Sequence, residues 1–177
     1  MSNKIRLATV WLDGCSGCHM SFLDMDERLL ELADKIELVS SPIMDAKDVP
    51  PNIDLTLIEG AVSSEEDLHK ALAFRKNSKL VMAFGDCAVT GNVPSMRNMF
   101  DVDEVYNRAY VETADTQKQV PRSVVPALLA RARPVHEVIH VDVHLPGCPP
   151  NADIIFYVLS ELIAGRMPDP MKIGKFG

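Results

Sequence analysis

The sequence predicts an α/β fold, in which helices cover both faces of a mostly parallel five-stranded sheet. Short apolar, largely β-branched runs alternate with segments whose apolar residues recur at helical spacing. Most of these runs end at a glycine-marked turn. Apolar residues make up 47% of the chain and charged residues 24%, as is typical of a globular protein. We expect one domain over residues 1–166 and an extended arm over 167–177.

The first half of the chain alternates between the two patterns. Residues 5–12 form an apolar run of strand length, and apolar side chains at helical spacing predict a crossover helix over 20–35. Further strands are expected at 36–40 and 54–58. After the third strand, Ser64 and the acidic residues that follow it in the sequence predict the start of a helix that runs through Phe74.

The second half begins with a near-continuously apolar strand over residues 79–84. Residues 100–123 show no clear period, and we interpret them as an irregular insertion. A helix is expected over 124–132, with Pro126 in its first turn. Asn151 then caps a last apolar helix that ends before Gly165.

Residues 135–145 predict a fifth strand, because buried-type and polar residues alternate along them. The polar positions are His140, Asp142 and His144, and a polar face is typical of an edge strand. Parallel strands need crossover connections, so the doubly wound, flavodoxin-like order 2-1-3-4-5 is expected.

All four cysteines lie in glycine-marked turns directly after predicted strands. Cys15 and Cys18 follow the first strand, Cys87 the fourth and Cys148 the fifth. By itself the Cys15-x-x-Cys18 pair could be a redox dithiol, half of a zinc site or two buried thiols. In a parallel sheet, however, all strand carboxyl ends lie on one edge, so we expect the four thiols to converge there with Glu59.

Four thiolates at one site suit either a 4Fe-4S cluster or a structural zinc ion. Zinc usually takes its ligands from two close pairs of residues. Here one close pair is joined by two distant single cysteines, which favours iron-sulfur, with zinc as the alternative.

The charge and hydropathy of the chain argue against a nucleic-acid-binding protein and against a membrane-spanning one. The formal charge of −7 and the absence of a basic stripe argue against a nucleic-acid partner. No apolar segment reaches the roughly 18 residues that a membrane span needs, and the amino terminus has no secretory leader pattern. We therefore expect a cytoplasmic protein, in which paired cysteines more often serve metal or redox chemistry than form disulfides.

Four ordered motifs carry a family resemblance: Trp11-Leu12-x-Gly14-Cys15-Ser16-Gly17-Cys18-His19-Met20-Ser21, Glu59-Gly60, Gly85-Asp86-Cys87-Ala88-Val89-Thr90-Gly91-Asn92-Val93-Pro94 and Pro146-Gly147-Cys148-Pro149-Pro150. Together they resemble the small subunit of nickel-iron hydrogenases, in particular the cytoplasmic, bidirectional NAD(P)-linked type. The resemblance implies that the four cysteines bind one proximal 4Fe-4S cluster. It places the nickel-iron site on a large subunit, and it implies transfer of electrons from H2 to iron-sulfur and FMN-containing diaphorase subunits that reduce NAD(P)+.

The resemblance also bears on other residues and on two alternatives. Ser16 and Glu59 are candidates for a proton relay, although each could instead hydrogen-bond the cluster loops. No FMN is expected on this chain, because the cysteine loop occupies the position of the flavodoxin phosphate loop.

Two alternative functions remain. The related small subunit of respiratory complex I, which passes electrons to quinone, is a weaker match because its motif has adjacent cysteines. A zinc-stabilised interaction module without redox activity is the third hypothesis.

Overall fold

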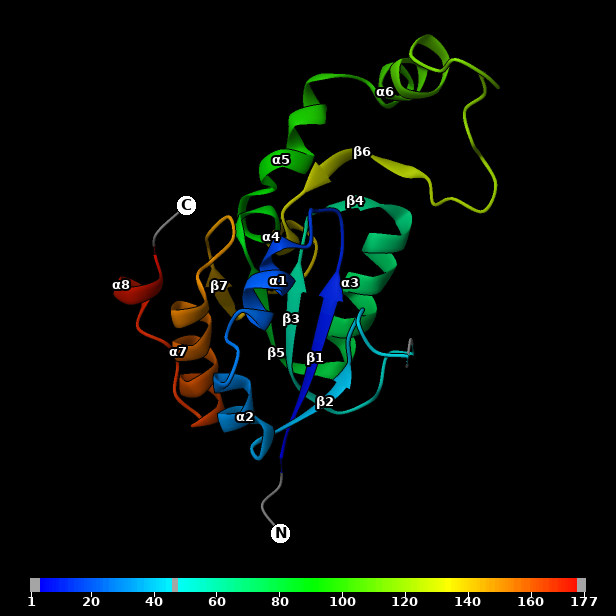
Figure 1. Cartoon of the computed structure of the whole chain (residues 1–177). Helices are drawn as coiled ribbons and strands as arrows, with labels where there is room; N and C mark the ends of the chain where they lie inside the picture. The colour runs from blue at the N-terminus through cyan, green and yellow to red at the C-terminus, as the bar shows by residue number, and fades with distance from the viewer. Residues whose placement is uncertain (1–3, 46–47, 175–177) are drawn as a thin grey trace.

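The computed structural model describes residues 4–45 and 48–174. Its centre is a five-stranded, all-parallel sheet with the order β2-β1-β3-β5-β7 (Figure 1). The strands are β1 (Ile5–Trp11), β2 (Ile36–Ser40), β3 (Ile53–Glu59), β5 (Ser78–Phe84) and β7 (Val143–Leu145). The predicted fold class and strand order are thus confirmed, including the edge position of the last strand.

Helices cover both faces of the sheet, as expected. The core on one face joins strand residues to α1 (Gly17–Leu23), α2 (Arg28–Ala33), α7 (Ala152–Ile163) and α8 (Pro170–Ile173). The core on the other face includes residues of α3 (Glu65–Asn77) and α4 (Asp86–Thr90). Strand β5 shows the alternation clearly, because Met82 and Phe84 belong to the first core whereas Val81 and Ala83 belong to the second.

The helix predicted over residues 20–35 is two short helices, α1 and α2, with a break between them. At the break Asp26 adopts a left-handed conformation with φ of 50°. Met25 beside it is buried in the core. The apolar period therefore continues across the break, which is why the sequence pattern did not reveal it.

The prediction of a helix over residues 124–132 is wrong. The structure instead has strand β6 (Leu128–Arg133), which pairs antiparallel with β4 (Val62–Ser64) in a small second sheet. β4 is only three residues long, so no local pattern marks it as a partner strand. This tertiary pairing overrides the local preference of the segment.

The fifth strand is much shorter than predicted. Only β7 pairs with β5, and residues 135–137 form the 3-10 helix η3 (Val135–Glu137). The alternation of burial was predicted correctly, since Ile139, Val141 and Val143 are buried and His140 and His144 are exposed. The three apolar residues do not share one face, however, because Val143 belongs to the first core whereas Ile139 and Val141 belong to the second. A run that alternates by side-chain burial does not need strand pairing throughout.

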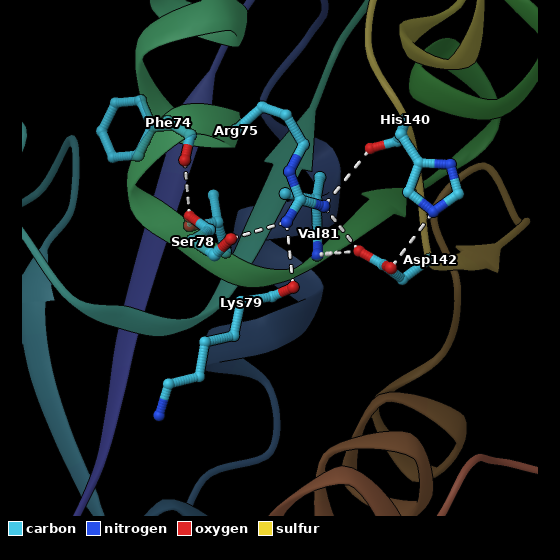
Figure 2. A network of polar contacts seen from close by, with 8 residues as sticks. Phe74, Arg75, Ser78, Lys79, Val81, His140 and Asp142 are labelled. Carbon is cyan, nitrogen blue, oxygen red and sulfur yellow. Dashed lines mark hydrogen bonds and ion pairs between the residues drawn. The ribbon is translucent and has the colours of Figure 1, made fainter.

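A polar network holds the segment before β7 against the sheet (Figure 2). The Asp142 carboxylate accepts hydrogen bonds from Nη1 of Arg75 at 2.6 Å and from the Val81 amide at 2.8 Å. Arg75 also donates to the carbonyls of Ser78 and Lys79 at 2.6 and 2.9 Å. The network thereby joins the end of α3, the start of β5 and the approach to β7.

An extension, defined here as residues 92–133, projects beyond the carboxyl edge of the sheet (Figure 1). It contains α5 (Asn92–Ser95), the 3-10 helix η1 (Met96–Met99), α6 (Val102–Asn107), the π-helix η2 (Arg108–Glu112) and β6. Residues 100–123, expected to be irregular, therefore hold two helical segments. Asp101 and Glu104 form a capping box that starts α6.

The carboxyl-terminal arm is not fully extended, because Pro170–Ile173 forms the short helix α8. The Asp169 side chain accepts a hydrogen bond from the Met171 amide, and Ile173 is buried in the core. Residues 175–177 of the predicted arm lie outside the described residues. Among the described helices, none is long and apolar enough to cross a membrane.

Candidate metal centre

The four cysteines lie beyond the carboxyl ends of β1, β5 and β7, on one edge of the sheet. Cys15 precedes α1 and Cys18 lies in its first turn, Cys87 lies in the first turn of α4, and Cys148 lies between β7 and α7. All four are free thiols. Cys18 is buried, Cys87 is half-buried, and Cys15 and Cys148 are exposed, so the group opens toward solvent at the edge of the sheet.

The thiols are close enough to affect one another electrostatically. Burial raises the pKa of Cys18 far above its ordinary value, and the charges of Glu59 and of the other three cysteines raise it further. Burial and the charges of Cys148 and Cys15 raise the pKa of Cys87 to about 11. Four thiolates can therefore share this site only if cations offset their mutual repulsion, as a metal cluster does.

The backbone around the thiols leaves room for sulfur where a side chain would not fit. Gly85 has φ of 85°, and a Cβ added there would lie 2.2 Å from the Sγ atom of Cys18. A Cβ at Gly17 would lie 3.2 Å from the Sγ atom of Cys15. These glycines let the chain approach the sulfurs closely, and the residues present fit a thiolate-bound cluster.

Hydrogen bonds fix the cysteine loops to one another. The buried Asp86 carboxylate accepts from the Gly147 amide at 2.6 Å, and the Asp86 amide donates to the Gly147 carbonyl at 2.9 Å. Asn92 donates to the Cys148 sulfur at 3.5 Å. The sequence pattern did not predict the roles of Asp86 and Asn92, although both lie within the motif around Cys87. The one signal in the sequence that could have indicated the role of Asp86 is that its carboxylate stands directly before the predicted ligand Cys87.

Glu59, at the end of β3, lies between the strands that carry the cysteines. It is only 3% exposed, and its carboxylate accepts hydrogen bonds from the amides of Cys18 and His19, each at 3.1 Å. It also contacts the His19 ring. These bonds hold the first turn of α1 in place. Hydrogen bonding of a cluster loop was the alternative to a proton relay that the sequence analysis gave for Glu59.

Ser16, the other relay candidate, precedes α1 with φ of 64° and makes no side-chain capping bond. The His19 ring packs edge-on against Trp11, with 5.3 Å between ring centroids. Its Nε2 atom is buried without a hydrogen-bond partner among the described residues.

The polar residues at the edge strand form no second metal site. Asp142 faces Arg75, and His144 instead contacts His136, with ring centroids 5.7 Å apart. Within residues 4–45 and 48–174, no group of three or more His, Cys, Asp or Glu side chains is placed to hold a single metal ion.

Comparison with known proteins places this geometry in a family. Residues 15–162 match the family model described as the 20-kDa subunit of NADH ubiquinone oxidoreductase. The chain is 41% identical over 98% of its length to the delta subunit of the NAD-reducing hydrogenase of Cupriavidus necator, covering 86% of that protein. It is 40% identical over 94% of its length to one subunit of the F420-non-reducing hydrogenase of Methanothermobacter marburgensis, but spans only 56% of that protein.

Solved structures agree with the sequence comparison. A chain in the crystal structure of an NAD+-reducing [NiFe]-hydrogenase in the H2-reduced state superimposes with a TM-score of 0.92, at 37% identity, covering 99% of this chain and all of the other. A [NiFeSe] hydrogenase from Desulfovibrio vulgaris Hildenborough shares the fold at 18% identity, with a TM-score of 0.62 over 92% of this chain and 60% of the other. The chain therefore belongs to the NADH ubiquinone oxidoreductase 20-kDa subunit family, and within it to the small subunits of NAD-reducing nickel-iron hydrogenases.

Proposed function

We propose that this chain is the electron-transfer small subunit of a cytoplasmic NAD(P)-reducing nickel-iron hydrogenase. Cys15, Cys18, Cys87 and Cys148 would hold one 4Fe-4S cluster, which accepts and releases single electrons when bound. Electrons from H2 would arrive from the nickel-iron site of a large subunit. They would leave to iron-sulfur and FMN-containing diaphorase subunits that reduce NAD(P)+.

The observation that carries the proposal is the convergence of four thiols on one sheet edge, in a chain 41% identical to an NAD-reducing hydrogenase subunit. That likeness favours NAD(P)+ over quinone as the final acceptor, although the family description names a ubiquinone enzyme. One close cysteine pair joined by two distant single cysteines suits a cubane better than zinc, which usually takes its ligands from two close pairs.

The residues of this chain have distinct tasks in the proposal. The Glu59 carboxylate holds the amides of Cys18 and His19, and Asp86 ties the Cys87 loop to the Cys148 loop through Gly147. The site stays rigid while its charge changes, because these bonds join elements that are fixed in the sheet. A proton relay through Ser16 or Glu59 belongs to the proposal as well, and substitution of Glu59 separates such a relay from loop holding.

FMN belongs to the diaphorase subunits in this proposal, because the cysteine turn follows β1 where flavodoxins bind the flavin phosphate. The proposal includes a cytoplasmic location, because the proposed electron acceptor, NAD(P)+, is a cytoplasmic cofactor.

The test is H2-driven reduction of NAD(P)+ by the complete complex, purified without oxygen. In a Cys87→Ala complex this activity is expected to fall to background, while NADH-driven dye reduction by the diaphorase subunits stays at the wild-type level. Wild-type H2-driven activity in the variant would contradict the proposal.

A further inference from the structure

The turn that follows α4, formed by residues 91–93, contacts two of the four thiols at once. The side-chain amide of Asn92 donates a hydrogen bond to the Cys148 sulfur at 3.5 Å. The Val93 backbone donates to the Cys87 sulfur. Burial and the neighbouring charges raise the pKa of Cys87, whereas this hydrogen bond favours its thiolate. One short turn therefore provides N–H donors to two sulfurs from distant parts of the sequence.

Asn92 stands in a backbone conformation in which glycine is the ordinary residue. Gly91 has φ of 85° and Asn92 has φ of 30°, so two successive residues lie in the left-handed region. The Gly91 amide donates to the Cys87 carbonyl at 3.0 Å, and the Ser95 hydroxyl donates to the Asn92 carbonyl at 2.7 Å. A second glycine would adopt this backbone with less strain but would have no amide group for the sulfur. The asparagine therefore adds a hydrogen-bond donor that the turn itself does not need.

No other side chain in the described part of the chain donates to one of the four sulfurs as Asn92 does. His19 stands directly after Cys18 and carries a ring N–H group, but its ring is turned away from the sulfurs. Its Nδ1 atom contacts Glu59, and its Nε2 atom has no partner among the described residues. The side-chain donor at the cysteine site thus comes from the turn after α4.

Hydrogen bonds to cysteine sulfurs help to set the reduction potential of an iron-sulfur cluster. An electron that enters the cluster adds negative charge, and the thiolate sulfurs carry part of it. An N–H donor binds a more negative acceptor more strongly, so it stabilises the reduced form more than the oxidised form. A donor to a ligand sulfur is therefore expected to raise the reduction potential.

From these contacts we propose that Asn92, acting through the Cys148 sulfur, is a positioning residue that raises the reduction potential of the cluster. The proposal rests on the proposed function, because it needs a cluster at the four cysteines. A higher potential makes this chain a better acceptor for electrons from H2 and a weaker donor toward NAD(P)+. Asn92 thereby helps to set the balance between the two halves of the reaction without touching either substrate.

The test is a redox titration of the full chain, purified without oxygen with its cluster bound, in which electron paramagnetic resonance measures the reduced cluster. Asn92→Gly keeps the backbone conformation and removes the donor. At the wild-type midpoint potential, the ratio of reduced to oxidised cluster is expected to fall roughly fivefold in this variant, as the loss of one hydrogen bond predicts. A larger fall is expected in Asn92→Asp, because a carboxylate of the same shape then faces the sulfur.

Asn52→Gly is the matched control. Asn52 is an exposed asparagine with φ of 57°, and it lies directly before β3, at the end of the sheet away from the cysteines. The substitution removes the same amide group from a similar backbone and is expected to leave the reduction potential unchanged. An unchanged potential in both Asn92 variants, or an equal fall in the control, would overturn the proposal.

A second measurement tests the contact in the wild-type chain and does not depend on how the variants fold. The chain is produced with asparagine labelled with nitrogen-15 in its side-chain amide. Pulsed electron paramagnetic resonance of the reduced cluster is expected to detect one coupled nitrogen-15 nucleus, and the coupling is expected to disappear in Asn92→Asp. Absence of the coupling from the wild-type chain would overturn the proposal. A wild-type chain with no reducible iron-sulfur signal at all would contradict the proposed function instead.

Discussion

At the residue scale, the cysteine site depends on a buried carboxylate that binds no metal in our proposal. Glu59 accepts two amide hydrogen bonds from the first turn of α1 and contacts the His19 ring, all in a nearly solvent-free position. A charged acceptor in such a place holds its donors strongly, but leaving any of them unpaired is costly. Its substitution therefore tests whether loop holding or proton transfer is the main role.

For Glu59→Gln we expect a loss of about 1 to 3 kcal/mol in the free energy of unfolding, because an amide group replaces one of the two acceptor oxygens. Denaturant unfolding of the anoxic complex measures it. The control is Glu37→Gln, whose carboxylate is 54% exposed in a surface ion pair, and here a change below about 1 kcal/mol is expected. Unchanged stability together with slower H2 turnover would show a relay and exclude the loop-holding role.

The second prediction at this scale concerns Gly85. In Gly85→Ala the new Cβ would lie 2.2 Å from the Cys18 sulfur, so we expect the chain to lose its iron-sulfur absorbance. Gly165→Ala is the matched control, because Gly165 also has positive φ, at 72°, but nothing lies within 4 Å of its added Cβ. That variant is expected to keep the absorbance and to lose only about 1 kcal/mol of stability from backbone strain. Equal absorbance in the two variants would contradict the glycine argument.

At the scale of elements, the sequence predicted the long buried strands well and failed where tertiary contacts decide. Strands β1, β3 and β5 are apolar runs that local patterns reveal. Strand β6 exists because it pairs with the three-residue β4, and its edge is held by the Arg97 and Asn98 side chains. No local pattern encodes such partners.

The Asp142 network of Figure 2 gives a prediction with a pH dependence. Burial alone would raise the pKa of Asp142, but hydrogen bonds from Val81 and Arg75 and the charge of Arg75 outweigh it and lower the pKa. A lowered pKa in the folded state stabilises the protein above the pKa of the unfolded state, near pH 4, and this contribution disappears as the pH falls through the lowered value. We expect Asp142→Asn to cost about 1 to 3 kcal/mol at neutral pH.

The free energy of unfolding of Asp142→Asn is therefore expected to lie below that of the wild type by the whole of this amount at pH 7. The difference is expected to shrink below about pH 4. Denaturant unfolding at the two pH values measures it. Asp153→Asn is the control, since that carboxylate is 77% exposed in an ion pair with Arg28 and should contribute below about 1 kcal/mol. A difference that grows on acidification would contradict the assigned sign.

At the scale of the whole molecule, topology explains how much of the site the sequence could predict. Once the strand order was inferred, the parallel sheet required the loops after β1, β5 and β7 to share an edge, and the structure brings the four cysteines together there. The supporting bonds of Asp86 and Asn92 could not be predicted, because they depend on how two loops approach each other. The extension was likewise unpredictable, since exposed helices and a minor strand pair leave weak sequence signals.

The central claim is that this chain holds an iron-sulfur cluster at the four cysteines. The most direct measurement is the iron and acid-labile sulfide content of the anoxically purified chain, with nickel measured in any larger subunit that accompanies it. The proposal predicts about four iron and about four sulfide ions per chain, with nickel in the larger subunit. Zinc without sulfide would contradict electron transfer by this chain, and iron-sulfur without nickel would point to the quinone-linked branch of the family.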